Sequence, residues 1–308
     1  MSKAFLFVRN LSKTFGRKKA LDGVSFEVYR GEIYSLLGPN GSGKTTLLSI
    51  IAGILSPDSG EVLINGLRPV DAEARKLIGY CPQESVVYDE LTGYENLMFY
   101  ARLHGLGDQA KSRCKELLRS MKLADYADKK VATYSGGMKK RLNFAISLLG
   151  DPELLLLDEP TVGLDPSVRR LVWDILLDLR KEGKSILLAT HYMEEADRLA
   201  DRVAIMNLGK ILVEDDPEAL KRNFGARAVI RVKLSGGDVK DLMQITERGI
   251  WDRVIYEDDV LKFFVHNPDQ AIPSLTSLLS KKGLKLEELK VIRPTLEDVF
   301  LNLTGRRL

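Results

Sequence analysis

The 308-residue sequence has few of the features that mark secreted, membrane-spanning or nucleic-acid-binding proteins. Its two cysteines, Cys81 and Cys114, lack the spacing of a metal site and favour a reduced, cytoplasmic setting. No apolar run approaches the length of a membrane-spanning helix, and residues 4–8 suggest a strand rather than a signal peptide. The net charge of +3 is too small to indicate nucleic acid. If the protein serves a membrane, we expect it to do so through another chain.

Residues 38–46 read G-P-N-G-S-G-K-T-T and match the loop G-x-x-x-x-G-K-[ST], which wraps the phosphates of ATP or GTP. Glycine lets backbone amides approach an anion, Lys44 can reach the outer phosphates, and Thr45 can offer a hydroxyl to Mg²⁺. The residues predicted to surround the nucleotide phosphates are Gly38, Asn40, Gly41, Ser42, Gly43, Lys44, Thr45 and Thr46. A glycine-rich turn before a helix would look similar, but a strand-like run at 33–37 and a helix-like run at 47–53 favour the phosphate loop.

The hydrophobic pattern predicts an α/β domain in the first two thirds of the chain. Residues 4–34 alternate apolar and polar side chains, which indicates antiparallel strands. The short apolar strands of a mainly parallel sheet are predicted at residues 33–37, 154–157, 186–189 and 203–206. Residues 88–150 contain no clear strand and predict a helical insert in this domain.

The pattern changes after residue 216, where we expect the first domain, residues 1–216, to end. Residues 217–226 are predicted to be a linker, with a helix as the alternative for residues 217–223. Residues 227–308 are predicted to form a small α+β domain. Its predicted strands are 227–234, 251–257, 260–266 and 286–292, and its predicted helices are 238–247, 269–282 and 295–303.

The apolar strand at 154–157 ends in Asp158 and Glu159. A buried strand followed by an acidic loop is the simpler interpretation, but the carboxyl ends of parallel strands are where α/β proteins bind ligands. With a phosphate loop upstream, Asp158 is predicted to hold Mg²⁺, directly or through water. A second carboxylate beside a polyanion needs a role of its own, so Glu159 is predicted to polarise a water for attack on the γ-phosphate.

A second anion site is predicted at residues 134–138, which read Y-S-G-G-M and open a helix with Ser135 as its N-cap. A well-capped helix is the plainer interpretation of this stretch. However, Ser135, Gly136 and Gly137 also leave exposed amides at a helix start, where an anion can bind. One nucleotide needs only one phosphate loop, so the second site requires an explanation.

Together, and in this order, these motifs resemble those of ABC-family ATPase subunits across residues 4–216. The resemblance gives roles to four further residues. Gln83, in Y-C-P-Q, matches the glutamine loop that senses Mg²⁺ and links to the membrane partner, and His191, in T-H-Y, matches the switch histidine near the γ-phosphate. Asp165, in G-L-D, matches the loop that crosses the dimer interface. Phe15 stands where the family stacks an aromatic ring on adenine.

The resemblance implies a P-loop NTPase core with an antiparallel β subdomain and a helical subdomain at about residues 88–150. It also implies that two subunits pair head to tail, with each ATP between Lys44 of one and Ser135 of the other, and we expect a homodimer. The residues implied to act in catalysis are Lys44, Glu159 and His191, and the implied ligands of Mg²⁺ are Thr45, Gln83 and Asp158.

Three segments are similar to the ATPases of drug-resistance and sodium-efflux exporters, namely residues 86–97, 191–196 and 294–301. We therefore expect an ATPase that powers a membrane exporter. It would be cytoplasmic, peripheral on the inner face of the cell membrane, and in contact with the membrane only through an integral permease subunit. Tyr88, Leu91 and Tyr94 are predicted to line a groove for a permease helix, or alternatively to pack between helices.

Two other classes of protein contain a phosphate loop. A soluble ABC ATPase that acts on nucleic acid or the ribosome would usually carry long coiled coils, zinc-type cysteines or two ATPase domains, and the sequence has none of these. A P-loop kinase or GTPase does not need Ser135-Gly136-Gly137 or His191. The C-terminal domain shows no binding chemistry, and a structural role is its default interpretation.

Overall fold

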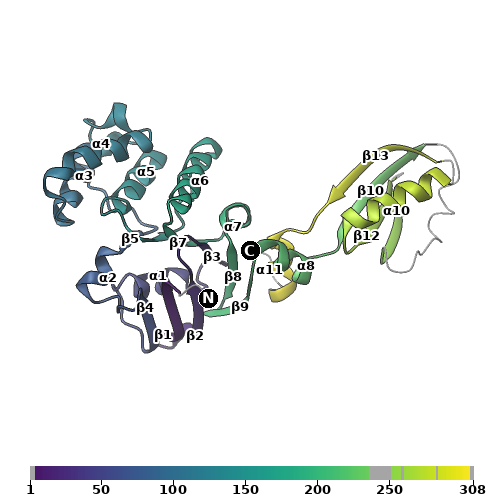
Figure 1. Ribbon diagram of the computed structural model, residues 1–308, viewed down its shortest axis with the longest axis horizontal. Helices are drawn as coiled ribbons and strands as arrows, with labels where there is room; N and C mark the ends of the chain where they lie inside the picture. Colours follow the sequence, from purple (N-terminus) through teal and green to yellow (C-terminus); the bar gives the residue numbers. More distant parts are fainter. Residues whose placement is uncertain (1–3, 236–250, 258–259, 282–283, 306–308) are drawn as a thin grey trace. The chain divides into compact units, whose positions relative to one another are not determined.

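The computed structural model describes residues 4–235, 251–257, 260–281 and 284–305 (Figure 1). The chain divides into two compact units, one ending at Pro217 and one beginning at Glu218, and each is described by itself. No helix within the described ranges is long and apolar enough to cross a lipid bilayer.

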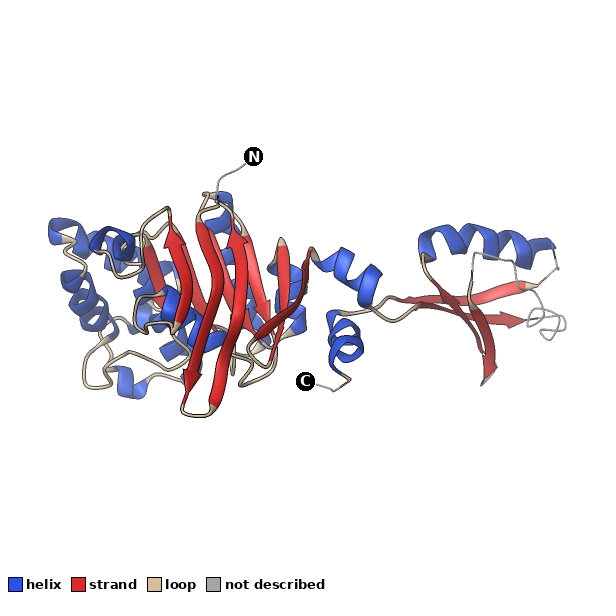
Figure 2. Cartoon of the chain, turned by 90° about the horizontal axis from the view of Figure 1, so that it is seen from below, coloured by secondary structure: helices blue, strands red, loops and turns tan. Residues whose placement is uncertain are grey.

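The first unit begins with a three-stranded antiparallel sheet. Strands β1 (Leu6–Phe15) and β2 (Lys18–Val28) form a hairpin, and β4 (Ser59–Ile64) pairs with the other edge of β1. The hairpin turns at Gly16, whose φ of 57° is left-handed and suits glycine. The two strands of the hairpin are the longest in Figure 2. The antiparallel strands predicted in residues 4–34 are thus confirmed up to the start of β3.

A six-stranded sheet forms the centre of this unit, in the order β5-β6-β7-β3-β8-β9. Its strands are β3 (Ile33–Leu37), β5 (Ile78–Cys81), β6 (Leu154–Asp158), β7 (Ser185–Thr190), β8 (Arg202–Asn207) and β9 (Lys210–Asp215). All neighbouring pairs are parallel except β8 and β9. The four predicted strands and the α/β class are confirmed. The edge strands β5 and β9 were not predicted, because their apolar runs are shorter than those of the inner strands.

Alternate side chains of the inner strands face two different hydrophobic cores. In β6, Leu155 and Leu157 pack with the helical segment that follows β5, whereas Leu154 and Leu156 pack with α1 (Lys44–Ile51) and the antiparallel sheet. All four leucines are fully buried. The strand is therefore held from both faces immediately before its acidic residues.

The helical segment predicted at 88–150 is confirmed. Its elements are α3 (Gly93–Leu103), η1 (Gly107–Gln109), α4 (Ala110–Ser120), η2 (Ala124–Tyr126), η3 (Val131–Thr133) and α5 (Gly136–Ser147), where η marks a 3₁₀ turn. Thr92 caps α3, because its hydroxyl accepts from the Glu95 amide while the Glu95 carboxylate accepts from the Thr92 amide. The remaining helices of the unit are α2 (Ala72–Lys76), α6 (Pro166–Lys181) after β6, and α7 (Met193–Leu199) after β7.

The second unit is a four-stranded antiparallel sheet with helices, in the strand order β11-β12-β10-β13. Its elements are α8 (Pro217–Phe224), β10 (Ala228–Ser235), β11 (Arg253–Glu257), β12 (Val260–Val265), α10 (Pro268–Lys281), β13 (Lys285–Ile292) and α11 (Leu296–Thr304). The predicted α+β class is confirmed, and residues 217–223 are helical. The helix predicted at 238–247 lies outside the described residues. One core joins the sheet to α10 through Ile230, Phe263 and Leu275.

Candidate nucleotide-binding site

The predicted phosphate loop runs from the end of β3 to the start of α1, so its backbone amides gather at a helix N-terminus. Two of its glycines have no room for a side chain. A Cβ on Gly38 would lie 2.2 Å from the carbonyl oxygen of Met206, and one on Gly43 would lie 2.5 Å from that of Ala20. Gly43 also has a φ of 109°, which L-residues with a side chain rarely adopt. The loop can therefore keep this path only with glycine at both positions.

A cleft of about 280 Å³ lies over this loop. It is lined by Phe15, Lys18, Ala20, Asn40, Gly41, Gly43, Lys44, Thr45, Thr46, Gln83 and Glu159. The structure thus brings the β1–β2 hairpin, the phosphate loop, the glutamine loop and the acid after β6 to one place. Lys18 and Ala20 were not predicted. The basic run Arg17-Lys18-Lys19 just after Phe15 was the available signal for a further anion contact there.

Phe15 lies at the edge of the cleft with half of its surface exposed (50%). The Lys13 ammonium is 5.7 Å from its ring centroid, a cation–π distance. An exposed large aromatic ring costs free energy in water unless something covers it. Phe15 is thus placed where a planar base could stack on it.

Lys44 is buried, and its ammonium bonds to its own loop. Nζ donates to the carbonyl oxygens of Gly38 (2.7 Å) and Pro39 (3.2 Å) and lies 3.4 Å from Oε1 of Glu159. Burial lowers the pKa of Lys44, and the nearby Glu159 carboxylate opposes this shift. Charge-assisted bonds to phosphate are stronger than bonds to neutral carbonyls. A bound phosphate can therefore replace the two carbonyl oxygens as the partner of the Lys44 ammonium.

Asp158 and Glu159 carry buried oxygen atoms without a full set of partners. Within the described part of the chain, neither oxygen of Asp158, nor Oε1 of Glu159, has a hydrogen bond of normal geometry. Burial raises the pKa of Asp158, and the hydroxyl of Thr45 is close enough to lower it in part. A buried anion beside a hydroxyl at a phosphate loop fits a divalent cation. In the described residues no cluster of His, Cys, Asp and Glu could hold a metal alone, so phosphate oxygens would have to complete its ligands.

Glu159 occupies a left-handed backbone conformation, with φ at 51°. Its amide donates to the carbonyl oxygen of Ala189 on the neighbouring strand β7 (2.9 Å), which holds this turn in place. Oε2 lies 2.8 Å from Nδ1 of His191, while Oε1 faces Lys44. The turn costs about 1–2 kcal/mol for a residue with a side chain. It places the carboxylate between a cation and an imidazole, with only 3% of it exposed.

The second anion motif lies outside this cleft. Ser135 caps α5, with its Oγ accepting from the Met138 amide at 3.3 Å, and Ser135 and Gly136 are exposed. None of residues 135–137 lines the cleft. Asp165 caps α6 and accepts from the amides of Ser167 and Val168. Hence the cleft contains one anion loop, and the exposed Ser135 loop is open to another molecule.

Replacing Asp158 with asparagine should stabilise the nucleotide-free protein by about 1–3 kcal/mol, because a buried charge disappears. This gain should shrink as pH falls through the raised pKa of Asp158, since the wild-type carboxyl then becomes neutral. The variant should lose the additional stabilisation that Mg²⁺ gives to the ATP-bound protein. Thermal unfolding of the nucleotide-free protein at several pH values measures the first effect, and unfolding with ATP, with and without Mg²⁺, measures the second. Asp151→Asn, at a largely exposed carboxylate (74%), is the matched control, and a lower melting temperature in Asp158→Asn would contradict the expectation.

Comparison with known proteins gives two family matches. Residues 21–162 match the model described as ABC transporter, and residues 216–304 match that of the C-terminal domain of DrrA1-3-like ATP-binding proteins. The chain is 40% identical to daunorubicin resistance ATP-binding protein DrrA3 of Streptomyces coeruleorubidus, over 99% of this chain and 97% of that one. It is 36% identical to linearmycin resistance ATP-binding protein LnrL of Bacillus subtilis (strain 168), over 98% and 99%. It is 39% identical to Nod factor export ATP-binding protein I of Rhizobium sp. (strain N33), over 100% and 99%.

Solved structures match about 70% of the chain. The ATP-binding subunit of an ABC transporter has a TM-score of 0.66 at 33% identity, and the match covers 71% of this chain and 93% of that one. The ATP-binding cassette MJ0796, a dimer in a post-hydrolysis state with ADP and Pi, has a TM-score of 0.64 at 28% identity, over 68% and 98%. With its phosphate loop and the carboxylates after β6, this chain belongs to the ABC transporter family, as an ATP-binding and ATP-hydrolysing subunit.

Proposed function

We propose that two copies of this chain close on ATP and hydrolyse it to drive export through a membrane permease. The observation that carries this proposal is the buried Glu159 carboxylate between Lys44 and His191, in a cleft that lacks the Ser135 loop. One copy thus offers a base and a phosphate loop, and its exposed Ser135 loop is free for the ATP of a second copy. The dimeric relative holding ADP and Pi supports this arrangement.

Each part of the cleft has a task in this reaction. Phe15 stacks on the base, residues 38–46 and Lys44 hold the phosphates, and Glu159 takes a proton from the attacking water. Mg²⁺ would be held by Thr45, Asp158 and Gln83, and it would neutralise charge on the outer phosphates. His191 orients the Glu159 carboxylate through the 2.8 Å contact at Nδ1.

Export is favoured over action on nucleic acid or the ribosome. The relatives matched along the full chain are named for drug resistance and for Nod factor export. The balanced charge agrees with this, since a nucleic-acid-binding surface is usually strongly basic. We therefore place the chain at the inner face of the cell membrane, held there by its permease.

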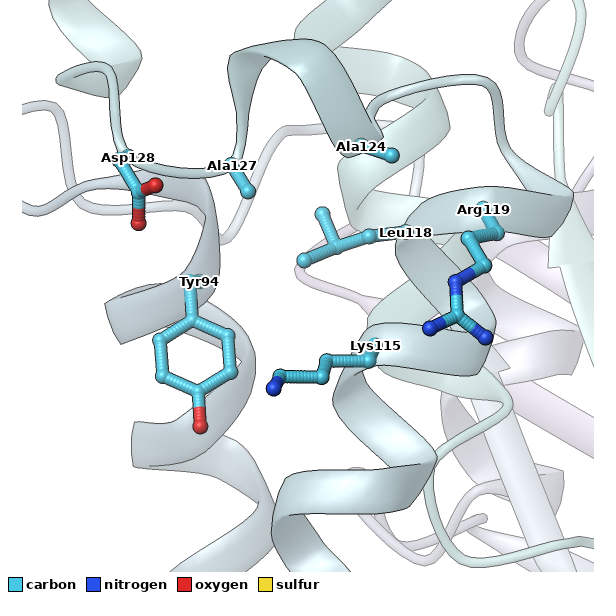
Figure 3. Close-up of a pocket in the computed structure, with 7 residues that line it drawn as sticks. All are labelled: Tyr94, Lys115, Leu118, Arg119, Ala124, Ala127 and Asp128. Atoms are coloured by element: carbon cyan, nitrogen blue, oxygen red, sulfur yellow. The ribbon is translucent and has the colours of Figure 1, made fainter.

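The permease would dock on a cavity of about 440 Å³ in the helical segment (Figure 3). The cavity is lined by Tyr94, Lys115, Leu118, Arg119, Ala124, Ala127 and Asp128. Tyr94, from α3, faces Lys115 and Leu118, from α4, across it (Figure 3). Of the three residues predicted for a groove, only Tyr94 lines this cavity. Tyr88 instead packs its ring against Phe99 at 5.3 Å. The lining combines apolar residues such as Leu118 and Ala127 with charged residues such as Lys115 and Asp128, which suits a short amphipathic helix.

Purification of the tagged protein from detergent-solubilised native membranes tests this function. We expect one polytopic membrane protein to accompany it. Ala124→Trp should fill the cavity and reduce the recovered permease about tenfold, the effect of 1.4 kcal/mol. Ala72→Trp, at another exposed helical alanine, is the matched control and should have no effect. Recovery of ribosomes or DNA in place of a membrane protein would overturn the exporter function.

A further inference from the structure

Helix α7 carries a fully buried carboxylate that the proposed reaction does not use. Glu195 has no exposed surface, although its neighbour Glu194 is largely exposed (74%). Burial of a carboxylate is strongly unfavourable unless hydrogen bonds offset it. We propose that Glu195 is a positioning residue that ties the loop after Glu159 to the loop of His191, an inference that rests on the proposed function.

Two buried donors meet on one oxygen of Glu195. Oε1 accepts from the Thr161 hydroxyl at 2.8 Å and from the Trp173 indole N–H at 3.1 Å. Burial raises the pKa of Glu195, and the side chains of Thr190, Thr161 and Trp173 each lower it. Thr161 and Trp173 are themselves buried, so loss of this acceptor would leave both donors without a partner.

These partners belong to the segments that surround the reaction site. Thr161 is two residues after Glu159 and four before Asp165, the cap of α6. Thr190 ends β7 directly before His191, and its hydroxyl accepts from the amide of Tyr192 (3.0 Å). The Thr190 carbonyl oxygen accepts from the first glycine amide of the phosphate loop (3.2 Å). Because Glu195 is on α7, four residues after His191, its bond to Thr161 joins the loop after Glu159 to the loop that presents His191.

Ring contacts beside Glu195 reinforce the link between α6 and α7. The Arg169 guanidinium of α6 lies 4.9 Å from the ring centroid of Tyr192, and the Arg198 guanidinium of α7 lies 5.3 Å from that of Trp173. The Tyr192 and His191 rings are 4.4 Å apart. These contacts and the bonds of Glu195 therefore fix the position of His191 relative to the start of α6.

The alternative is that Glu195 only fills the core and has no effect on the position of Glu159 and His191. Kinetic measurements distinguish the positioning role from this structural role. Glu195→Ala should reduce kcat about 10²-fold, the effect of about 1 Å of misplacement, and leave KM for ATP unchanged. Glu195→Gln keeps an acceptor oxygen for Thr161 and Trp173, so it should restore most of kcat. Glu194→Ala removes the exposed neighbouring carboxylate and its 3.9 Å surface pair with Arg169, which contributes little, so it is the matched control and should act as wild type.

A second variant guards against loss of the fold in Glu195→Ala. Thr161→Val keeps the shape and removes one donor, so it should reduce kcat about three- to tenfold. Its effect should vanish in the Glu195→Ala background, because the two residues act through one bond. Wild-type kcat in both single variants, or an equal loss of ATP affinity and kcat, would overturn the proposal. Absence of ATP-driven dimerisation in the wild type would instead refute the proposed function.

Discussion

Replacing Glu159 with glutamine is expected to reduce ATP hydrolysis about 10²- to 10⁴-fold, the contribution of a general base. Glutamine fills the same buried space but cannot take a proton from water. ATP binding should persist, because Lys44 and the phosphate loop are unchanged. The loss of a negative charge beside the phosphates should also favour the ATP-bound dimer. Light scattering after gel filtration with ATP and Mg²⁺ should therefore show a stable dimer.

The control for this variant is a glutamate at the other end of the same strand. Glu153 precedes β6, is partly exposed (42%) and pairs with Arg30 at 2.6 Å. Glu153→Gln makes the same chemical change away from the cleft and should hydrolyse ATP at the wild-type rate. Full hydrolysis in Glu159→Gln would remove Glu159 from the role of base. Loss of hydrolysis without a trapped dimer would argue against ATP shared by two copies.

Replacing Ser135 with arginine should abolish ATP-driven dimerisation while the monomer still binds ATP. The long side chain would occupy the exposed start of α5, where the phosphates of the second copy's ATP are proposed to bind. Because Ser135 does not line the cleft of its own chain, the monomer should keep its affinity for ATP. Hydrolysis should fall to the level of the isolated monomer. Fluorescent ATP titration and light scattering measure binding and dimerisation separately.

A second exposed serine in the helical segment gives the matched control. Ser112 is on α4, where its hydroxyl donates to the Gln109 carbonyl oxygen at 2.8 Å. Ser112→Arg adds the same charge and bulk without touching α5, and it should dimerise as wild type. Dimerisation of Ser135→Arg at the wild-type ATP concentration would refute a shared site. Loss of monomeric ATP binding would mean that Ser135 acts within its own chain.

Sequence alone predicted the centre of this site because each part depends on local rules. The strand, loop and helix around Lys44 follow from the glycine pattern, and Asp158 follows from the end of an apolar strand. The rule that parallel strands end at one edge then brings Glu159 and His191 near the phosphate loop. The α/β class and four parallel strands of the six-stranded sheet were predictable for the same reason, since each of these strands contains a fully buried apolar run.

The features that sequence missed depend on tertiary packing. Lys18 and Ala20 reach the cleft only because the hairpin register places the start of β2 over the phosphate loop. Glu195 lies in the polar stretch M-E-E-A-D-R-L, which indicates an exposed helix face. Its burial follows from the packing of α7 against α6 and β7, and its position four residues before Leu199, on the same helix face, was the local signal that separates it from Glu194.

Strand β6 has a further consequence for how this protein can change over evolution. Its odd- and even-numbered leucines belong to separate hydrophobic cores, one shared with the helical segment and one with the antiparallel sheet. The helical segment or the antiparallel sheet could be exchanged for that of a relative only if the new segment still packed against the same leucines of β6. The strand that leads to Asp158 and Glu159 therefore lies between the helical segment and the antiparallel sheet. A substitution in this strand has to be compatible with the packing of both.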